Sequence, residues 1–229
     1  LKTAVNAGVE ICFTNPGTTE LPLVSAFDTV PGIRPILGLF EGCCTGAADG
    51  YGRMTGQPAM TLLHLGPGLG NGIANLHNAR RARTPVLNVI GEHATWHRSA
   101  DSPLSMDIVA LAESVSGWQR TSTVSQHLSQ DTADAITAAL SGKVATLIVP
   151  SDVQWSEKSG DDKIHPPKAF DGFVETESIE RAVALLRTEK KAALILGGWA
   201  LRPSGLAAAA RIKIQTGCDL ISERAPARM

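Results

Sequence analysis

The alternation of short apolar runs with longer segments of helical periodicity is the feature that most constrains the fold. The apolar runs are rich in Val, Ile and Leu with little polar alternation, as expected for strands buried on both faces of a sheet. They cover residues 10–14, 33–40, 59–65, 85–91, 146–150 and 192–197. Helical patterns fall between them, at 19–29, 41–54, 70–82, 107–114, 125–140 and 177–188. This repetition predicts βαβ units with right-handed crossovers, and therefore an α/β fold with an open parallel sheet flanked by helices.

One polar segment interrupts the alternation. It carries two prolines and two glycines, and we expect it to form an interdomain linker over residues 156–175. Residues 1–155 then form a first domain, and residues 176–229 repeat the α/β pattern on a scale too small to close a sheet. We therefore expect the second unit to be the start of a larger α/β domain. The chain also opens without Met and stops abruptly, which indicates a fragment of a longer protein.

Composition and charge argue against several classes of function. The 229 residues carry a formal net charge of -1 and only 4% aromatic residues, which disfavours binding to nucleic acid or to an anionic membrane surface. No apolar run is long enough to span a membrane. The four cysteines form no C-x-x-C pair, so we expect reduced thiols in a cytoplasmic protein.

The ends of the predicted strands carry the candidate functional residues. Ligands of open α/β sheets bind beyond the carboxyl ends of the strands. Four of the predicted strands end in residues that could contact a ligand, and these are Asn15-Pro16-Gly17, Glu41, His64 and Glu92-His93. The four strand ends are therefore candidates for a ligand site.

Glu41 follows an apolar run and opens a predicted helix ahead of the small residues Gly42, Cys43 and Cys44. One interpretation is a first-turn acid that the helix dipole favours. The other is a carboxylate held in an apolar wall, where proton transfer to a ligand becomes feasible. The small residues after it would let a ligand ring approach closely. Local sequence leaves both interpretations open.

Glycines recur at every second position from Gly66 to Gly72, after the third strand. A Gly-x-Gly turn between strand and helix can cradle a pyrophosphate, but the last position of a G-x-G-x-x-G window is Asn71 here. A dinucleotide site and a tight structural turn both stay open. His93 and His97 have the spacing of a metal pair, but they fall in a polar loop without an evident third ligand. We therefore predict no metal site.

Three motifs follow one another along the first domain. They are Gly8-Val9-Glu10…Pro16-Gly17, Glu41…Ala47-Ala48-Asp49-Gly50-Tyr51-Gly52-Arg53 and Gly66-Pro67-Gly68…Asn71-Gly72-Ile73-Ala74. Their order and spacing resemble the pyrimidine-binding domain of thiamine-diphosphate-dependent 2-oxo-acid enzymes, over about residues 4–155. The nearest resemblance is to the large subunits of acetolactate synthase and similar decarboxylases. The second unit resembles the start of the central domain of the same family.

The resemblance implies thiamine diphosphate as cofactor and Glu41 as the residue that hydrogen-bonds its pyrimidine ring and activates it. His64 stands where the family commonly has a small hydroxyl residue, and Glu92-His93 where many members have glutamine. We therefore expect His64, Glu92 and His93 to face the substrate, a small 2-oxo acid that is decarboxylated or ligated. The residues implied to line the pyrimidine end of the cofactor are Asn15, Pro16, Gly17, Glu41, His64, Pro67 and Asn71.

The diphosphate-binding motif of the family, a Gly-Asp-Gly followed by an Asn pair, does not occur in the sequence. Because that motif holds magnesium, the resemblance implies that a domain outside this sequence supplies the metal and diphosphate sites. Family sites form between two subunits, so a homodimer or homotetramer is implied. FAD, which some members bind in the central domain, stays open because Gly197-Gly198-Trp199-Ala200 is too short a match. A non-catalytic pyrimidine-type binding module and a dinucleotide-binding oxidoreductase domain remain as alternatives.

Overall fold

The structure is a computed structural model that describes residues 1–156, 174–188 and 191–224. The chain divides into two compact units, Leu1–Ala169 and Phe170–Met229. The predicted linker over 156–175 falls almost entirely outside the described residues. The predicted boundaries of the two domains therefore stay predictions.

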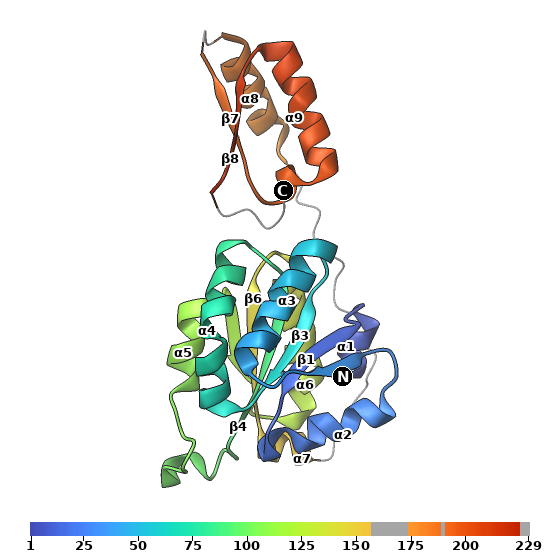
Figure 1. Cartoon of the computed structure of the whole chain (residues 1–229), viewed down its shortest axis with the longest axis vertical. Coiled ribbons are helices and arrows are strands. Elements are labelled where there is room, and N and C mark those ends of the chain that lie inside the picture. The colour runs from blue at the N-terminus through green and yellow to red at the C-terminus, as the bar shows by residue number, and fades with distance from the viewer. Residues whose placement is uncertain (157–173, 189–190, 225–229) are drawn as a thin grey trace. The chain divides into compact units, whose positions relative to one another are not determined.

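The first unit is built on a six-stranded sheet in which every neighbouring pair is parallel (Figure 1). The strand order is β2-β1-β3-β4-β6-β5, which confirms the predicted open parallel sheet. The strands are β1 (Ile11–Asn15), β2 (Arg34–Leu37), β3 (Ala59–Leu63), β4 (Val86–Glu92), β5 (Trp118–Thr121) and β6 (Val144–Pro150).

Helices cover both faces of this sheet, as Figure 1 shows. Because successive side chains of a strand point to opposite faces, the central strands β1, β3, β4 and β6 contribute to two separate cores. Met60 and Leu62 pack with the helices α1 and α6, whereas Ala59 packs with α3, α4 and α5. The helices of the first core are α1 (Lys2–Asn6), α2 (Leu21–Thr29) and α6 (Leu128–Leu140); those of the second are α3 (Glu41–Thr55), α4 (Leu65–Arg81) and α5 (Ile108–Val115). A short helix, α7 (Ser151–Trp155), follows β6.

The second unit has the predicted helix-strand-helix-strand order. It consists of α8 (Thr176–Thr188), β7 (Ala193–Leu196), α9 (Pro203–Thr216) and β8 (Asp219–Ser222), and its two strands are parallel. Its buried core in the described residues is small and is formed by Leu196, Leu201 and Ala209. Four 3-10 turns complete the described structure, at Thr18–Glu20, Arg98–Ala100, Ser125–His127 and Gly198–Leu201.

Three details of the prediction were wrong. The run over 33–40 was expected to be buried on both faces, but β2 ends at Leu37 and is an edge strand on which Leu37 is 66% exposed. β5 was not predicted, because it lies at the other edge and its sequence Trp-Gln-Arg-Thr lacks an apolar run. α4 begins at Leu65 rather than residue 70, so the glycine-rich stretch is helical. None of the described helices combines the length and apolarity that crossing a membrane requires.

Candidate functional site

The carboxyl ends of β1, β3 and β4 lie side by side at one end of the sheet, which we call the carboxyl edge. Asn15 pairs with Leu63 and Leu63 with Ile90, so β4 continues two residues further, to Glu92. From β1 the chain crosses to β2 on one side and then returns past β1 to β3 on the other. The edge between β1 and β3 is therefore a topological switch point, where open α/β sheets bind ligands.

A buried carboxylate with a hydrogen bond to one of its two oxygens lies at this carboxyl edge. Glu41 is the first residue of α3 and is only 8% exposed. Asn71 Nδ2 donates a hydrogen bond to Glu41 Oε2 at 2.9 Å. Oε1 faces Gly68, where a β-carbon would lie 3.1 Å away. The protein thus holds one oxygen through a hydrogen bond, and the other lies against a glycine that presents no side chain to it. We call Glu41, Gly68 and Asn71 the Glu41 cluster.

The start of α3 is held against the middle of α4, and this contact places Glu41. Thr45 Oγ1 lies 3.1 Å from Gly72 O, and Asn75 Nδ2 donates to Gly42 O at 2.7 Å. Gly72 permits this approach, because a β-carbon there would lie 2.8 Å from Thr45 Cγ2. One of the glycines that suggested a phosphate-binding turn, Gly72, instead lets two helices approach each other. The dinucleotide-site interpretation of this stretch is therefore not supported by the structure.

Cys44 lies one turn after Glu41 in α3, and the Glu41 carboxylate affects the pKa of its thiol. Burial raises the pKa of its thiol above the ordinary value, a backbone hydrogen bond at Gly38 opposes the rise, and the charge of Glu41 adds to it. Burial also raises the pKa of the Cys12 thiol, on β1. Cys43, the neighbour of Cys44, is exposed instead. Cys12 and Cys44 are therefore protonated core side chains at neutral pH, unlike reactive thiolates.

A second buried carboxylate, Glu20, is completely enclosed. It is 0% exposed, and its Oε2 accepts from Gly17 N at 2.7 Å and lies 2.8 Å from His64 Nδ1. Its Oε1 accepts from Thr19 Oγ1 at 3.0 Å. The His64 ring lies so close to Gly17 that a β-carbon there would overlap it. We call Gly17, Thr19, Glu20 and His64 the His64 cluster.

Glu20 was not predicted as a site residue. Three residues after Gly17 and just ahead of α2, it has the sequence position of an ordinary first-turn acid. The signal that identifies it is its contact with His64, which lies 44 residues away in the sequence. That contact exists only because β1 and β3 are neighbours in the sheet.

Three further predicted cofactor residues lie at the same edge. Asn15 Nδ2 donates to Gly38 O at 2.8 Å, which ties the end of β1 to the residue after β2. Pro16 follows β1 and Pro67 lies in the first turn of α4, and both are half-buried. Their contacts with a cofactor stay predictions.

Glu92 and His93 face the segment that follows β4. Glu92 is 3% exposed; its Oε2 lies 3.8 Å from Arg98 Nε and its Oε1 accepts from His93 N at 2.8 Å. The His93 ring packs edge-on against His97, with centroids 5.7 Å apart. An open pocket of about 570 Å³ adjoins Glu92 and Arg98. Among the described residues, no group of three or more His, Cys, Asp or Glu is placed to hold a metal ion. The substrate roles of Glu92 and His93 stay predictions.

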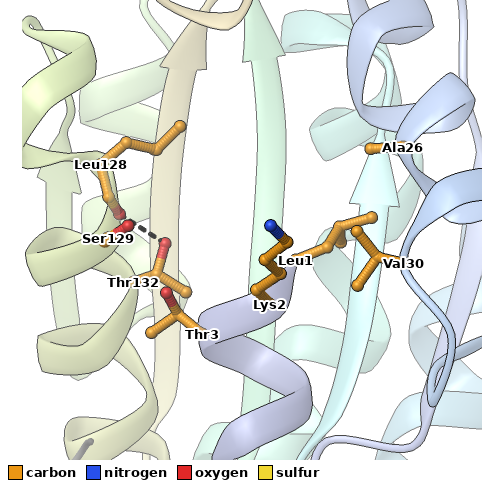
Figure 2. A pocket seen from close by; sticks show the side chains of 8 residues that line it. All are labelled: Leu1, Lys2, Thr3, Ala26, Val30, Leu128, Ser129 and Thr132. Carbon is orange, nitrogen blue, oxygen red and sulfur yellow. Dashed lines mark hydrogen bonds between the residues drawn. The ribbon is translucent and has the colours of Figure 1, made fainter. Parts of the chain in front are cut away.

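A separate hollow of about 220 Å³ lies on the other face of the sheet, between α1, α2 and α6 (Figure 2). Its lining is mostly aliphatic and hydroxyl side chains, and Thr132 Oγ1 donates to Leu128 O at 2.7 Å within α6. None of the predicted site residues lines this hollow. It is therefore distinct from the switch-point site.

Comparison with known proteins identifies the first unit. The family described as thiamine pyrophosphate enzyme, N-terminal TPP binding domain, matches residues 1–111. Residues 1–111 are a thiamine pyrophosphate enzyme N-terminal domain. The matched residues include both clusters, so the Glu41 cluster and the His64 cluster lie in a domain of the type that binds thiamine pyrophosphate, or thiamine diphosphate.

Relatives of this thiamine pyrophosphate enzyme domain carry the names of two activities. The chain is 48% identical over 227 residues to the "Putative acetolactate synthase large subunit IlvX" of Mycobacterium tuberculosis, covering 99% of this chain and 44% of that protein. It is 31% identical over 153 residues to a benzoylformate decarboxylase of Pseudomonas aeruginosa, covering 66% of this chain and 28% of that protein. The chain thus spans less than half the length of these relatives.

A solved structure has the same fold. The thiamine diphosphate-dependent 4-hydroxybenzoylformate decarboxylase of Rhodococcus jostii superposes with a TM-score of 0.85 over 98% of this chain and 44% of that one. The sequence identity is 21%, so this likeness concerns the fold. Both units of the chain fall within the covered part.

The Glu41 cluster fits the pyrimidine end of thiamine diphosphate. A flat aminopyrimidine ring would need a carboxylate as hydrogen-bonding partner and a neighbouring residue without a bulky side chain. Glu41 offers an oxygen that faces Gly68, while Asn71 fixes the orientation of the carboxylate. The exposed apolar side chains of Leu39 and Phe40 lie immediately before Glu41 in the sequence, at 91% and 49% exposure, and supply nonpolar surface.

The second unit of the chain bears on the open question of FAD. Gly198 N donates to Glu223 Oε1 at 2.8 Å, and a β-carbon at Gly197 would lie 2.8 Å from the same carboxyl group. The Glu223 carboxylate therefore already accepts the hydrogen bond from the backbone amide that would bind a phosphate at this turn. The structure offers no support for FAD at Gly197-Gly198.

Proposed function

We propose that the chain is the N-terminal part of a thiamine-diphosphate-dependent enzyme that decarboxylates or ligates small 2-oxo acids, in the manner of acetolactate synthase. The observation that carries the proposal is the Glu41 carboxylate, 8% exposed, with one oxygen fixed by Asn71 and the other beside Gly68. The family membership and the names of the relatives support the same activity.

Glu41 acts by holding a proton at the pyrimidine ring. When bound, the cofactor supplies the carbon nucleophile that attacks the keto group of the 2-oxo acid. Glu41 Oε1 would accept a hydrogen bond from the ring, and the hydrogen bond from Asn71 to Oε2 keeps the carboxylate in a fixed orientation. The contact between α3 and α4 fixes the position of this carboxylate within the protein.

The substrate binds on the His64 side of the site. His64, Glu92 and His93 present imidazole and carboxylate groups at the ends of β3 and β4, where a 2-oxo acid and its product would lie. These groups differ from the glutamine and small hydroxyl side chains that the family commonly has. The product is therefore open between a released aldehyde and a ligated acid.

The remaining parts of the enzyme lie outside the described residues. Magnesium and the diphosphate are held by a further domain, and a second subunit completes the site, so the enzyme is a homodimer or homotetramer. Four free cysteines support a reduced, cytoplasmic location.

The decisive experiment is Glu41→Gln in the full-length protein, with thiamine diphosphate and magnesium added. Hydrogen–deuterium exchange at the thiazolium C2 position, followed by NMR, falls on the order of 1,000-fold, because the residue that holds the ring proton is lost. The exposed Glu10→Gln serves as the matched control and exchanges at the wild-type rate. Cofactor still binds to Glu41→Gln. Unchanged exchange in Glu41→Gln, or no exchange in the wild type, contradicts the proposal.

A further inference from the structure

The pocket beside Glu92 contains a cation that the proposed function does not yet use. The pocket has a volume of about 570 Å³, and four charged side chains line it. Arg98 is the basic one among these described lining residues. It opens the 3-10 turn Arg98–Ala100, in which Ala100 N donates to His97 O at 3.1 Å. A hydrogen-bonded turn therefore presents this guanidinium to the pocket.

Glu92 holds the Arg98 guanidinium by charge and leaves its N–H groups to a ligand. Glu92 is 3% exposed, and its Oε2 lies 3.8 Å from Arg98 Nε. The two groups form an ion pair, but the separation is too long for a hydrogen bond. Within the described part of the chain the guanidinium donates no hydrogen bond, and the Arg98 side chain is 45% exposed. The planar group can therefore donate two parallel hydrogen bonds to a carboxylate in the pocket.

The three acids of the pocket do not exclude an anion. The charge of Glu92 is matched by Arg98 itself. Asp107 Oδ1 accepts the Ala110 N–H at 2.9 Å at the start of α5, where the positive end of the helix compensates a carboxylate. Asp101 is exposed, so water and salt screen its charge. The guanidinium of Arg98 is thus the charged group of this pocket with hydrogen-bonding capacity left over.

The pocket adjoins the same turn of α4 that contacts Glu41. Met106 lines the pocket, and its side chain lies so close to Gly66 that a β-carbon there would overlap it. Gly68, two residues further along the helix, faces Glu41 Oε1. Glu92 belongs both to the pocket and to the strand ends at which we place the substrate. A substrate whose keto group lies at the cofactor therefore extends its other end toward Arg98.

We propose that Arg98 is a specificity-determining residue that binds a second carboxylate, at the end of the substrate away from the keto group. The substrates are then dicarboxylic 2-oxo acids, and this inference rests on the proposed function. Ligand pockets have volumes of about 300–1,000 Å³, so this one accommodates a chain longer than that of a three-carbon acid.

Arg98 binds the carboxylate that stays in the product, and not the one that leaves as carbon dioxide. An ion pair to the leaving carboxylate would stabilise the ground state more than the transition state, in which that charge disperses, and would slow the reaction. An ion pair to the distant carboxylate is the same in both states, so it strengthens binding of the substrate. The effect of Arg98 therefore falls mainly on KM.

The first test compares substrates of equal chain length in the full-length protein with thiamine diphosphate and magnesium. The pairs are 2-oxoglutarate with 2-oxopentanoate and 2-oxoadipate with 2-oxohexanoate, which differ by a terminal carboxylate in place of a methyl group. We expect kcat/KM for one dicarboxylate to exceed that of its partner on the order of 30-fold, from two hydrogen bonds between charged groups. A wild type that uses both monocarboxylates at least as well contradicts the proposal.

The second test measures the same pairs in three variants. Arg98→Met keeps the length of the side chain and removes its charge, so kcat/KM for the preferred dicarboxylate falls on the order of 30-fold, mostly through KM, while the monocarboxylate stays within about threefold. Arg98→Lys recovers part of the loss, because it restores the charge without the planar fork. The exposed Arg181→Met is the matched control and behaves as the wild type. Equal losses for both members of a pair in Arg98→Met refute the role of Arg98.

Exchange of the C2 proton, which needs no substrate, separates the failure of this inference from that of the proposed function. If the wild type neither exchanges the C2 proton nor consumes any 2-oxo acid, the proposed function fails, and the role of Arg98 with it. If Glu41→Gln abolishes exchange while Arg98→Met leaves the ratio of dicarboxylate to monocarboxylate turnover unchanged, the proposed function holds and the role of Arg98 is refuted.

Discussion

Two carboxylates lie buried at the same edge of one sheet, and they differ in what surrounds them. Glu20 is 0% exposed and both of its oxygens are bonded to the His64 cluster. Glu41 is 8% exposed, with Oε2 bonded to Asn71 and Oε1 beside Gly68. Each carboxylate packs against a glycine. A β-carbon at Gly91 would overlap Glu20 Oε1, whereas a β-carbon at Gly68 would lie 3.1 Å from Glu41 Oε1, a tight contact that a small shift relieves.

This difference separates a residue that positions others from one that meets a ligand. A carboxylate whose hydrogen-bonding capacity is used within the protein stabilises an arrangement of its neighbours. A carboxylate with one oxygen left beside a glycine can accept a hydrogen bond from a bound molecule. The contrast predicts that changes around Glu20 affect folding first, and that changes around Glu41 affect cofactor binding first.

Gly91→Ala should have the largest effect on stability, because the added methyl group displaces Glu20 from its partners. We expect the free energy of unfolding to fall by about 3 kcal/mol, from overpacking and from the loss of bonds to a buried charge. Urea unfolding of the full-length protein, followed by circular dichroism, measures the change. The matched control is Gly68→Ala, which adds the same methyl group beside Glu41.

Gly68→Ala should lower stability by less than about 1 kcal/mol, because its β-carbon would lie 3.1 Å from Glu41 Oε1 and a small shift of that side chain relieves the contact. It should instead weaken thiamine diphosphate binding, measured by calorimetry. Equal losses of stability in the two alanine variants would remove the distinction between the enclosed and the open carboxylate.

Asn71→Ala tests how far the orientation of Glu41 depends on its single amide partner. A hydrogen bond to a charged group contributes about 1.5–3 kcal/mol, and solvent screening reduces this because Asn71 is exposed. We expect about a tenfold slower C2 proton exchange, with stability nearly unchanged. Asn78→Ala, an exposed position on the same helix, should exchange at the wild-type rate. If Asn71→Ala also exchanges the C2 proton at the wild-type rate, the α3–α4 contact alone orients Glu41.

The smallest effect concerns Cys44, whose raised pKa reports on the burial around Glu41. A thiol with a raised folded-state pKa stabilises the fold fully below its unfolded pKa, about 8.5, and the contribution is lost as pH rises. Stability should therefore stay level up to about pH 8 and then decline, and Cys44→Ala should make the decline shallower by at most about 1 kcal/mol per pH unit.

Denaturant midpoints between pH 7 and 10 measure this decline. Cys43→Ala removes an exposed thiol from the same turn and should keep the wild-type slope, because solvent reaches that side chain in both states. A Cys44→Ala protein whose stability declines as steeply as the wild type would exclude a link between this thiol and alkaline unfolding.

Much of the fold could be predicted because its strands are apolar and its helices fall between them. The exceptions are at the sheet edges, where half of a strand's surroundings is solvent. β5 has the sequence Trp-Gln-Arg-Thr and no apolar run, and Leu37 of β2 is 66% exposed. Edge strands are held by pairing with a neighbour more than by their own hydrophobicity, so local sequence contains little information about them.

The sequence by itself determined the α/β alternation, the motifs of the thiamine pyrophosphate enzyme family and the place of Glu41 at the start of a helix. Only the tertiary structure decided which carboxylate is enclosed and which is open. The reason is that burial and hydrogen-bond saturation depend on residues far apart in the chain: Glu20 meets His64 across 44 positions, and Glu41 meets Asn71 across 30. Two acids at helix starts, with similar local sequence roles, acquire different chemistry from the strands that happen to lie beside them.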